Sequence, residues 1–113
     1  MKIINLNRNL VLAEKAILAN SFSARLKGLL GFKSLKQDQA MVLSPCNSVH
    51  TFFMHFPIDV LFVDKDNRVI EMVQDMKPFR AVAVCFRSEF VVELPSGVID
   101  STDTSIGDIL QIQ

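Results

Sequence analysis

The sequence lacks any long uninterrupted hydrophobic run, although half of its 113 residues are hydrophobic. Polar or charged residues interrupt every apolar stretch before it reaches the roughly 18 residues of a membrane-spanning helix. Residues 1–12 also lack the apolar core and the small-residue cleavage site of a secretory signal. We therefore expect no membrane span and a cytoplasmic location.

Cysteine is scarce as well. The two cysteines, Cys46 and Cys85, are far apart and form no C-x-x-C pair, which excludes the zinc-ribbon and dithiol redox motifs. Cys85 lies within an apolar run and is expected in the core. The glycine-rich phosphate-binding motifs G-x-G-x-x-G and G-x-x-x-x-G-K-[ST] are also absent. Nucleotide binding through these two motifs is therefore not expected.

Net charge is absent too, because 12 basic residues balance 12 acidic ones. This balance removes the basic footprint of most nucleic-acid-binding proteins, so no nucleic-acid partner is expected. The charges are nevertheless segregated along the chain. Basic residues outnumber acidic ones up to Lys36, and every charged residue after Ser88 is acidic. We favour a fold in which the two segments pack together; the alternative is an anion-facing surface of Arg25, Lys27, Lys33 and Lys36.

Short segments with β-type sequence make up most of the chain. Strands are expected at Lys2–Leu6, Leu10–Ala13, Ala40–Leu43, Val49–Met54, Val60–Asp64, Arg68–Val73, Ala81–Phe86, Phe90–Leu94 and Asp108–Ile112. The clearest hairpin joins the fifth and sixth of these, with Asn67 in the left-handed conformation.

One helix is expected from about Phe22 to Leu30, with Ser21 as its N-cap, Gly28 inside it and Gly31 ending it. A shorter helical turn is expected from Pro95 through Ile99. Together these segments predict an α+β fold: one domain over residues 1–113, whose mostly antiparallel sheet is curled or small and barrel-like, with one or two short helices.

The densest group of chemically capable residues runs from Cys46 to Asp59 and contains both histidines of the chain. A thiolate–imidazole pair of Cys46 and His50 is one interpretation. A soft-metal site of Cys46, His50 and Met54 is a second, but no four-ligand spacing supports it, so no metal and no cofactor are expected. The third is a ligand cleft with aromatic and methionine walls. Its structural alternative makes Phe53 and Met54 core residues and Asp59 an acceptor of backbone N–H groups at a turn.

Five blocks of the sequence then carry a resemblance to a known family. In order they are Arg25-x-x-Gly28-Leu29-Leu30, Met41-Val42-Leu43, Phe53-Met54-x-x-Pro57-Ile58-Asp59-x-x-Phe62-x-Asp64, Glu93-Leu94-Pro95-Ser96-Gly97 and Gly107-Asp108. This pattern resembles the bacterial and archaeal family called domain of unknown function 192, over about Ala24 to Ile109. The resemblance implies a compact β-rich α+β domain and no particular activity. Phe53 stands where the family usually has Trp.

From these observations the preferred function is a small binding or accessory module with a cleft around Phe53-Met54 and Asp59. Its other polar residues are Arg25, His50 and Glu93. The partner is an unidentified small molecule or protein. A hydrolase or transferase that uses Asp59, Glu93 and His50 for acid–base chemistry is the alternative, and a structural partner of a larger assembly is the third.

Overall fold

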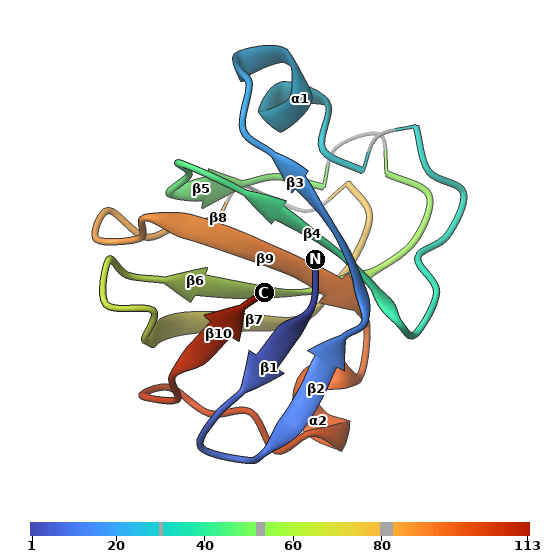
Figure 1. Ribbon diagram of the computed structural model, residues 1–113. Helices are drawn as coiled ribbons and strands as arrows, with labels where there is room; N and C mark the ends of the chain where they lie inside the picture. Colours follow the sequence, from blue (N-terminus) through green and yellow to red (C-terminus); the bar gives the residue numbers. More distant parts are fainter. Residues whose placement is uncertain (30, 52–53, 80–82) are drawn as a thin grey trace.

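The computed structural model describes residues 1–29, 31–51, 54–79 and 83–113. These residues form ten strands and two short helices, which are labelled in Figure 1. They are β1 (Ile3–Asn5), β2 (Leu10–Ala13), β3 (Lys15–Ala19), α1 (Phe22–Lys27), β4 (Gln39–Leu43), β5 (Ser48–Val49), β6 (Ile58–Val63), β7 (Val69–Met76), β8 (Ala83–Val84), β9 (Phe90–Pro95), α2 (Val98–Ser101) and β10 (Leu110–Ile112). The predicted α+β class is confirmed. No helix in the described ranges is both long and apolar enough to cross a membrane.

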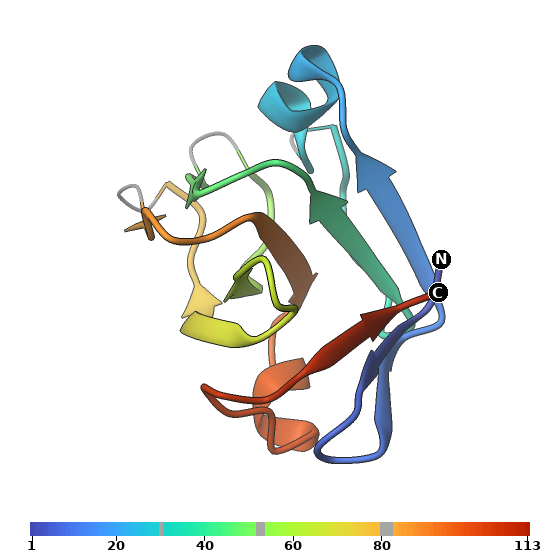
Figure 2. The same cartoon turned by 60° about the vertical axis from the view of Figure 1, so that its left-hand side comes forward.

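The strands form three sheets, in the orders β10-β1-β2, β3-β4-β9-β6-β7 and β5-β8. All pairings between these strands are antiparallel except β3 with β4, which α1 connects as a parallel pair. The first and last strands are neighbours, and the two chain ends lie side by side in Figures 1 and 2. Lys2 and Gln113 exchange backbone hydrogen bonds of 3.0 and 2.8 Å there.

The middle of the five-stranded sheet is buried on both faces, and every residue of its central strands β6 and β9 is buried. One face packs with the three-stranded sheet and α2 around a core that includes Ile3, Leu61 and Leu94. A second core, on the other face, includes Leu29, Leu43 and Met54. This double burial explains why β6 and β9 are almost continuously apolar in sequence. Cys85 is half-buried and packs against the second core, not fully inside it.

The predicted hairpin of β6 and β7 is confirmed, with Asn67 at φ 61°. The long strand predicted over Val49–Met54 is wrong, since β5 ends at Val49. The chain turns at Thr51, whose carbonyl accepts the N–H groups of Met54 and Phe79 at 3.2 and 2.8 Å. The predicted strand over Ala81–Phe86 lies partly outside the described residues, and β8 occupies only Ala83–Val84 of it.

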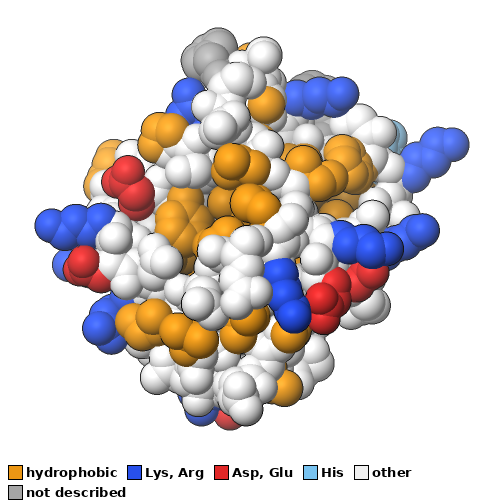
Figure 3. Space-filling view, viewed as in Figure 1, with side chains coloured by type: hydrophobic (Ala, Val, Ile, Leu, Met, Phe, Trp, Pro, Cys, Tyr) orange, Lys and Arg blue, Asp and Glu red, His pale blue; other side chains and the backbone are white. Residues whose placement is uncertain are grey.

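Sequence patterning missed β3 entirely. In this edge strand the small Ala16 and Ala19 are buried, whereas Ile17 and Leu18 are 46% and 45% exposed. The large apolar side chains of β3 are therefore not the buried ones, so the alternation of large apolar residues in the sequence does not predict this strand. Figure 3 shows hydrophobic side chains over the centre of the face that carries β3 and its neighbours, with Lys, Arg, Asp and Glu around them.

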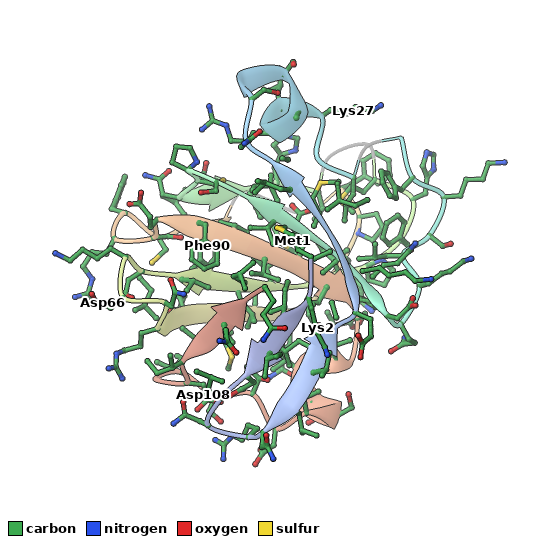
Figure 4. The ribbon with its side chains drawn as sticks, in the orientation of Figure 1. Met1, Lys2, Lys27, Asp66, Phe90 and Asp108 are labelled. Atoms are coloured by element: carbon green, nitrogen blue, oxygen red, sulfur yellow. The ribbon has the colours of Figure 1, made fainter. Side chains whose placement is uncertain are left out.

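Side chains of the basic and acidic segments form ion pairs beside the β1–β2 turn, which agrees in part with the expectation that the two segments pack together. Arg8 lies 3.2 Å from Asp108 and 3.7 Å from Asp103. Asp108 also accepts hydrogen bonds from Asn5 Nδ2 and from the Ser105 N–H group, both at 2.9 Å. These contacts tie the β1–β2 turn to the segment before β10. Figure 4 shows Asp108 at the opposite end of the molecule from Lys27 of α1.

Candidate functional site

A pocket of about 300 Å³ opens between the end of α1 and the segment that follows β4. Its lining comes from residues 25–29, 43, 45–50, 54 and 93. The pocket therefore combines a helix terminus, a loop and the exposed end of the second core with one residue of the central strand β9. Such a mixture of apolar walls and a few polar groups is typical of small-molecule sites.

Helix α1 is short because of the residue at its end. Ser21 caps its start and accepts the Ala24 N–H group at 3.1 Å, as the sequence predicts. Gly28 was expected inside the helix, but it is the C-cap, with φ 48° and ψ −125° and its N–H group bound to the Ala24 carbonyl. This backbone conformation suits only glycine, so the helix ends three residues earlier than predicted. The chain then turns inward, and Leu29 is 2% exposed in the pocket wall.

Arg25 fixes α1 to the loop after β4. Its Nη1 donates to the Pro45 carbonyl at 2.6 Å, and its Nε donates to the Ser21 carbonyl at 3.3 Å. The Ser44–Pro45 peptide bond is cis, which turns the chain at this point. Both hydrogen-bond acceptors are neutral. Among the described residues, no carboxylate forms a salt bridge with the Arg25 guanidinium.

Glu93 lies in the middle of the central strand β9, between Met41 of β4 and Val60 of β6. Its residue surface is only 4% exposed, yet it lines the pocket. Its Oε2 atom has no hydrogen-bond partner in the part of the chain that the structure describes. Burial disfavours the charged form and raises the pKa of this carboxyl to about 7. An acidic group with a pKa of about 7 therefore lines the pocket.

Cys46 lines the pocket together with Arg25 and Glu93. Its Sγ donates to the Ser48 carbonyl at 3.0 Å, and the residue is half-buried. Burial raises the pKa of the thiol, and Glu93 raises it further while Arg25 lowers it. The thiol is therefore protonated at neutral pH, whereas a cysteine nucleophile needs the thiolate form. This argues against the thiolate–imidazole interpretation of Cys46 and His50.

The histidines separate in the structure. His50 is half-buried in the pocket wall, whereas His55 is exposed and does not line the pocket. Across residues 1–29, 31–51, 54–79 and 83–113, no three His, Cys, Asp or Glu residues cluster so as to hold a metal ion. The soft-metal interpretation combined Cys46 and His50 with Met54, and all three residues line the pocket, so it stays a prediction.

Asp59 does not line the pocket. Its carboxylate accepts the backbone N–H groups of Asp75 at 2.8 Å, Gly97 at 3.0 Å and Ile99 at 2.9 Å. The residue is 1% exposed. It therefore joins the end of β7 to the start of α2. The short helix expected from Pro95 begins only at Val98, since Pro95 still belongs to β9 and Gly97 turns the chain at φ 99°.

Of the six residues singled out from sequence, the structure brings four together in the pocket: Arg25, His50, Met54 and Glu93. Phe53 lies outside the described residues. Sequence reasoning did not include the pocket wall made by Gly28, Leu29, Leu43 and Ser48. The resemblance did contain the first three of these, but their meeting depends on the parallel pair of β3 and β4, which sequence patterning did not show.

Comparison with known proteins identifies the family. The family model of DUF192, described as an uncharacterized ACR, matches residues 3–112. The chain belongs to this family. The UPF0127 protein PH1112 of Pyrococcus horikoshii is 34% identical over 110 residues, which are 94% of each chain. The UPF0127 protein TK1120 of Thermococcus kodakarensis is 30% identical over 112 residues, covering 96% of this chain and 71% of the relative.

Two solved structures share the fold of this DUF192 chain. A protein of unknown function from Novosphingobium aromaticivorans superposes with a TM-score of 0.86 at 19% identity, over 98% of this chain and 82% of the other. A putative transcription regulator from Sinorhizobium meliloti gives a TM-score of 0.84 at 20% identity, over 97% and 89% of the two chains. At these identities the likeness concerns the fold alone.

Proposed function

We propose that this DUF192 protein is a small-molecule-binding module and that its ligand occupies the pocket between α1 and the segment after β4. The observation that carries the proposal is Glu93, a carboxyl buried in the central strand whose Oε2 atom lacks a partner among the described residues. Burying an unpaired polar group costs about 1–3 kcal/mol, so a fold retains one chiefly where it serves a purpose. A ligand in the pocket supplies the missing partner.

The composition of the pocket supports the same proposal. Leu29, Leu43 and Met54 form apolar walls, and the polar groups are few and come from separate elements. A volume of about 300 Å³ is at the lower end of the usual range for organic ligands. The site therefore suits a compact molecule, and we propose this class of partner over a protein.

The hydrolase or transferase alternative finds less support. It needs Asp59, Glu93 and His50 to act on one substrate, but the three backbone N–H groups of the β7–α2 junction occupy the carboxylate of Asp59. Glu93 and His50 remain in one pocket without a second carboxylate beside them. Binding is the function that this arrangement supports best.

A fragment screen by NMR tests the proposal. The probes are neutral, cationic, anionic and zwitterionic organic fragments of up to about ten heavy atoms, followed through the backbone amide signals of the ¹⁵N-labelled protein. We expect shifts concentrated at Gly28, Cys46 and Val49, with Lys65 in the β6–β7 turn unchanged. Ser48 is exposed at the pocket, so Ser48→Trp blocks the site. Ser34 is also exposed but does not line the pocket, and Ser34→Trp is the matched control. Shifts that are scattered, or that survive Ser48→Trp, would refute the proposal.

A further inference from the structure

The pocket is lined by a basic and an acidic side chain, Arg25 and Glu93, that have no oppositely charged partner among the described residues. On one side, the hydrogen bonds of the Arg25 side chain go to the neutral backbone carbonyls of Ser21 and Pro45. Lys27, two residues further along α1, is exposed. No carboxylate lies within salt-bridge distance of either residue in the described parts of the chain. This side therefore has capacity for an anion.

On the other side, Glu93 forms no salt bridge with a cation among the described residues. Salt bridges within the described residues involve other carboxylates, and burial alone accounts for its altered titration. Buried charges in proteins are normally paired with an opposite charge or a hydrogen-bond donor. In its ionised form, Glu93 therefore lacks an ammonium or another N–H donor.

These two sites are close together but do not neutralise each other. Arg25, Cys46 and Glu93 all line the pocket, and Glu93 and Arg25 shift the pKa of the Cys46 thiol in opposite directions. Arg25 is held toward the Pro45 carbonyl at 2.6 Å instead of toward Glu93. The space between them is walled by Leu29, Leu43 and Met54, which suits a methylene chain.

We propose that the pocket binds a small zwitterion, whose ammonium group pairs with Glu93 and whose carboxylate pairs with Arg25. This inference rests on the proposed function and names its ligand class. A simple anion leaves Glu93 without a partner. A simple cation is repelled by the positive charges of Arg25 and Lys27 and gives them no anionic partner. A molecule with both charges, joined by a short apolar spacer, satisfies each side.

The proposal has a pH dependence whose sign is specific. An ammonium pairs with the ionised form of Glu93, and this carboxyl has a pKa of about 7 in the free protein. Affinity should therefore rise about tenfold between pH 6 and pH 8, whereas a ligand that accepts a hydrogen bond from protonated Glu93 shows the opposite trend. The other charged or titratable groups around the pocket are Arg25, Lys27, Cys46 and His50. A His50→Gln variant separates the contribution of the imidazole.

The test uses four ω-amino acids that differ in spacer length: β-alanine, 4-aminobutyrate, 5-aminovalerate and 6-aminohexanoate. n-Butylamine and butyrate are single-charge controls, and affinities come from NMR shift titrations of the full chain at pH 6 and pH 8. We expect at least one zwitterion to bind ten times more tightly than either control. Glu93→Gln and Arg25→Gln should each weaken binding at least tenfold, whereas Lys65→Gln in the distant β6–β7 turn should not change it. Unfolding curves verify that each variant is folded.

The outcomes separate the two proposals. If a control binds as tightly as every zwitterion, or if affinity falls from pH 6 to pH 8, the zwitterion is ruled out while the pocket remains a ligand site. The same holds if no zwitterion binds but neutral fragments still occupy the pocket. If neither zwitterions nor fragments shift the pocket amides, both proposals fail.

Discussion

Asp59 and Glu93 lie on adjacent strands, yet their side chains point to opposite faces of the five-stranded sheet. In the register of β6 and β9, Asp59 is opposite Leu94 and Glu93 is opposite Val60. Directly opposed residues share a face and successive residues alternate between faces, so the two carboxyls are separated by the sheet itself. Leu94 belongs to the core beside α2, and Val60 to the core beside the pocket. One acid thus serves the fold, and the other faces the pocket.

This separation predicts that Asp59→Asn destabilises the protein. An amide group has only one acceptor oxygen, whereas the carboxylate of Asp59 accepts three backbone N–H groups through both of its oxygens. At least one buried donor loses its acceptor, at a cost of about 1–3 kcal/mol. The check is the urea midpoint of the variant against wild type, with Asp66→Asn in the exposed β6–β7 turn as control. Equal midpoints for all three proteins would show that Asp59 has no structural role.

Glu93→Gln should have the opposite effect on stability, and only at higher pH. Burial raises the pKa of Glu93 from 4.5 to about 7 in the folded state. Between these values the folded protein binds more protons than the unfolded chain, so the contribution of Glu93 to stability is present below pH 4.5 and lost as the pH rises to 7. The loss is on the order of 3 kcal/mol.

The measurement is the difference in unfolding free energy between Glu93→Gln and wild type at pH 5 and pH 8. We expect the variant to gain relative stability at pH 8, because its neutral amide escapes the cost of ionisation. Comparing the difference at the two pH values cancels the titration of all other groups that the substitution leaves unchanged. A difference independent of pH would mean that Glu93 titrates normally.

Gly28→Ala should destabilise the protein through backbone strain. Gly28 has φ 48° and ψ −125°, a conformation that side chains disfavour, although an added Cβ would approach only to 3.8 Å from the Arg25 carbonyl and 3.9 Å from Leu43. The cost is therefore conformational, about 1–3 kcal/mol, and not a steric clash. Gly31→Ala is the control, because there the nearest atom belongs to the flexible end of Lys27. The measurement is the melting temperature of each variant. Equal melting temperatures for Gly28→Ala and Gly31→Ala would exclude strain at Gly28.

Asp108→Asn should weaken the junction between the β1–β2 turn and the segment before β10. Burial by itself would raise the pKa of Asp108, but hydrogen bonds from Asn5, Ser105 and Arg8, together with the charge of Arg8, lower it overall. The stabilisation from this carboxylate is therefore present above pH 3.8 and is lost as the pH falls through the lowered folded value. At pH 7 we expect a loss of about 1–3 kcal/mol in the variant. In urea titrations at acid pH, the difference in unfolding free energy between the variant and wild type should become smaller. A difference that grows as the pH falls would contradict this assignment.

The fold was predictable from sequence where burial and polarity follow the strand period. The β6–β7 hairpin is an example, because its two apolar runs flank a polar turn that contains Asn67. Prediction failed at β3, where alanines face inward and Ile17 and Leu18 face outward. It also failed at Gly28, where an interior helix position and a helix end look alike in sequence, and the observed φ decides between them.

The pocket was predictable in composition but not in geometry. Glu93 stands out as an acid within the apolar run of β9, and Arg25 lies in the one clear helix. Asp59 is also an acid beside an apolar run, and only the register with β9 shows that it points away from Glu93. Local sequence identifies an unusual carboxyl, whereas the pairing of distant strands determines which face it occupies.

The most direct test of the account is the titration of the Glu93 side chain itself. The ¹³Cδ signal of Glu93, assigned by its loss in Glu93→Gln, reports ionisation of this carboxyl alone. We expect a midpoint of about 7 in the free protein, and a lower midpoint once an ammonium-bearing ligand occupies the pocket. A midpoint at the ordinary value of 4.5 in the free protein would contradict the account, since Glu93 would then already be solvated or paired without a ligand.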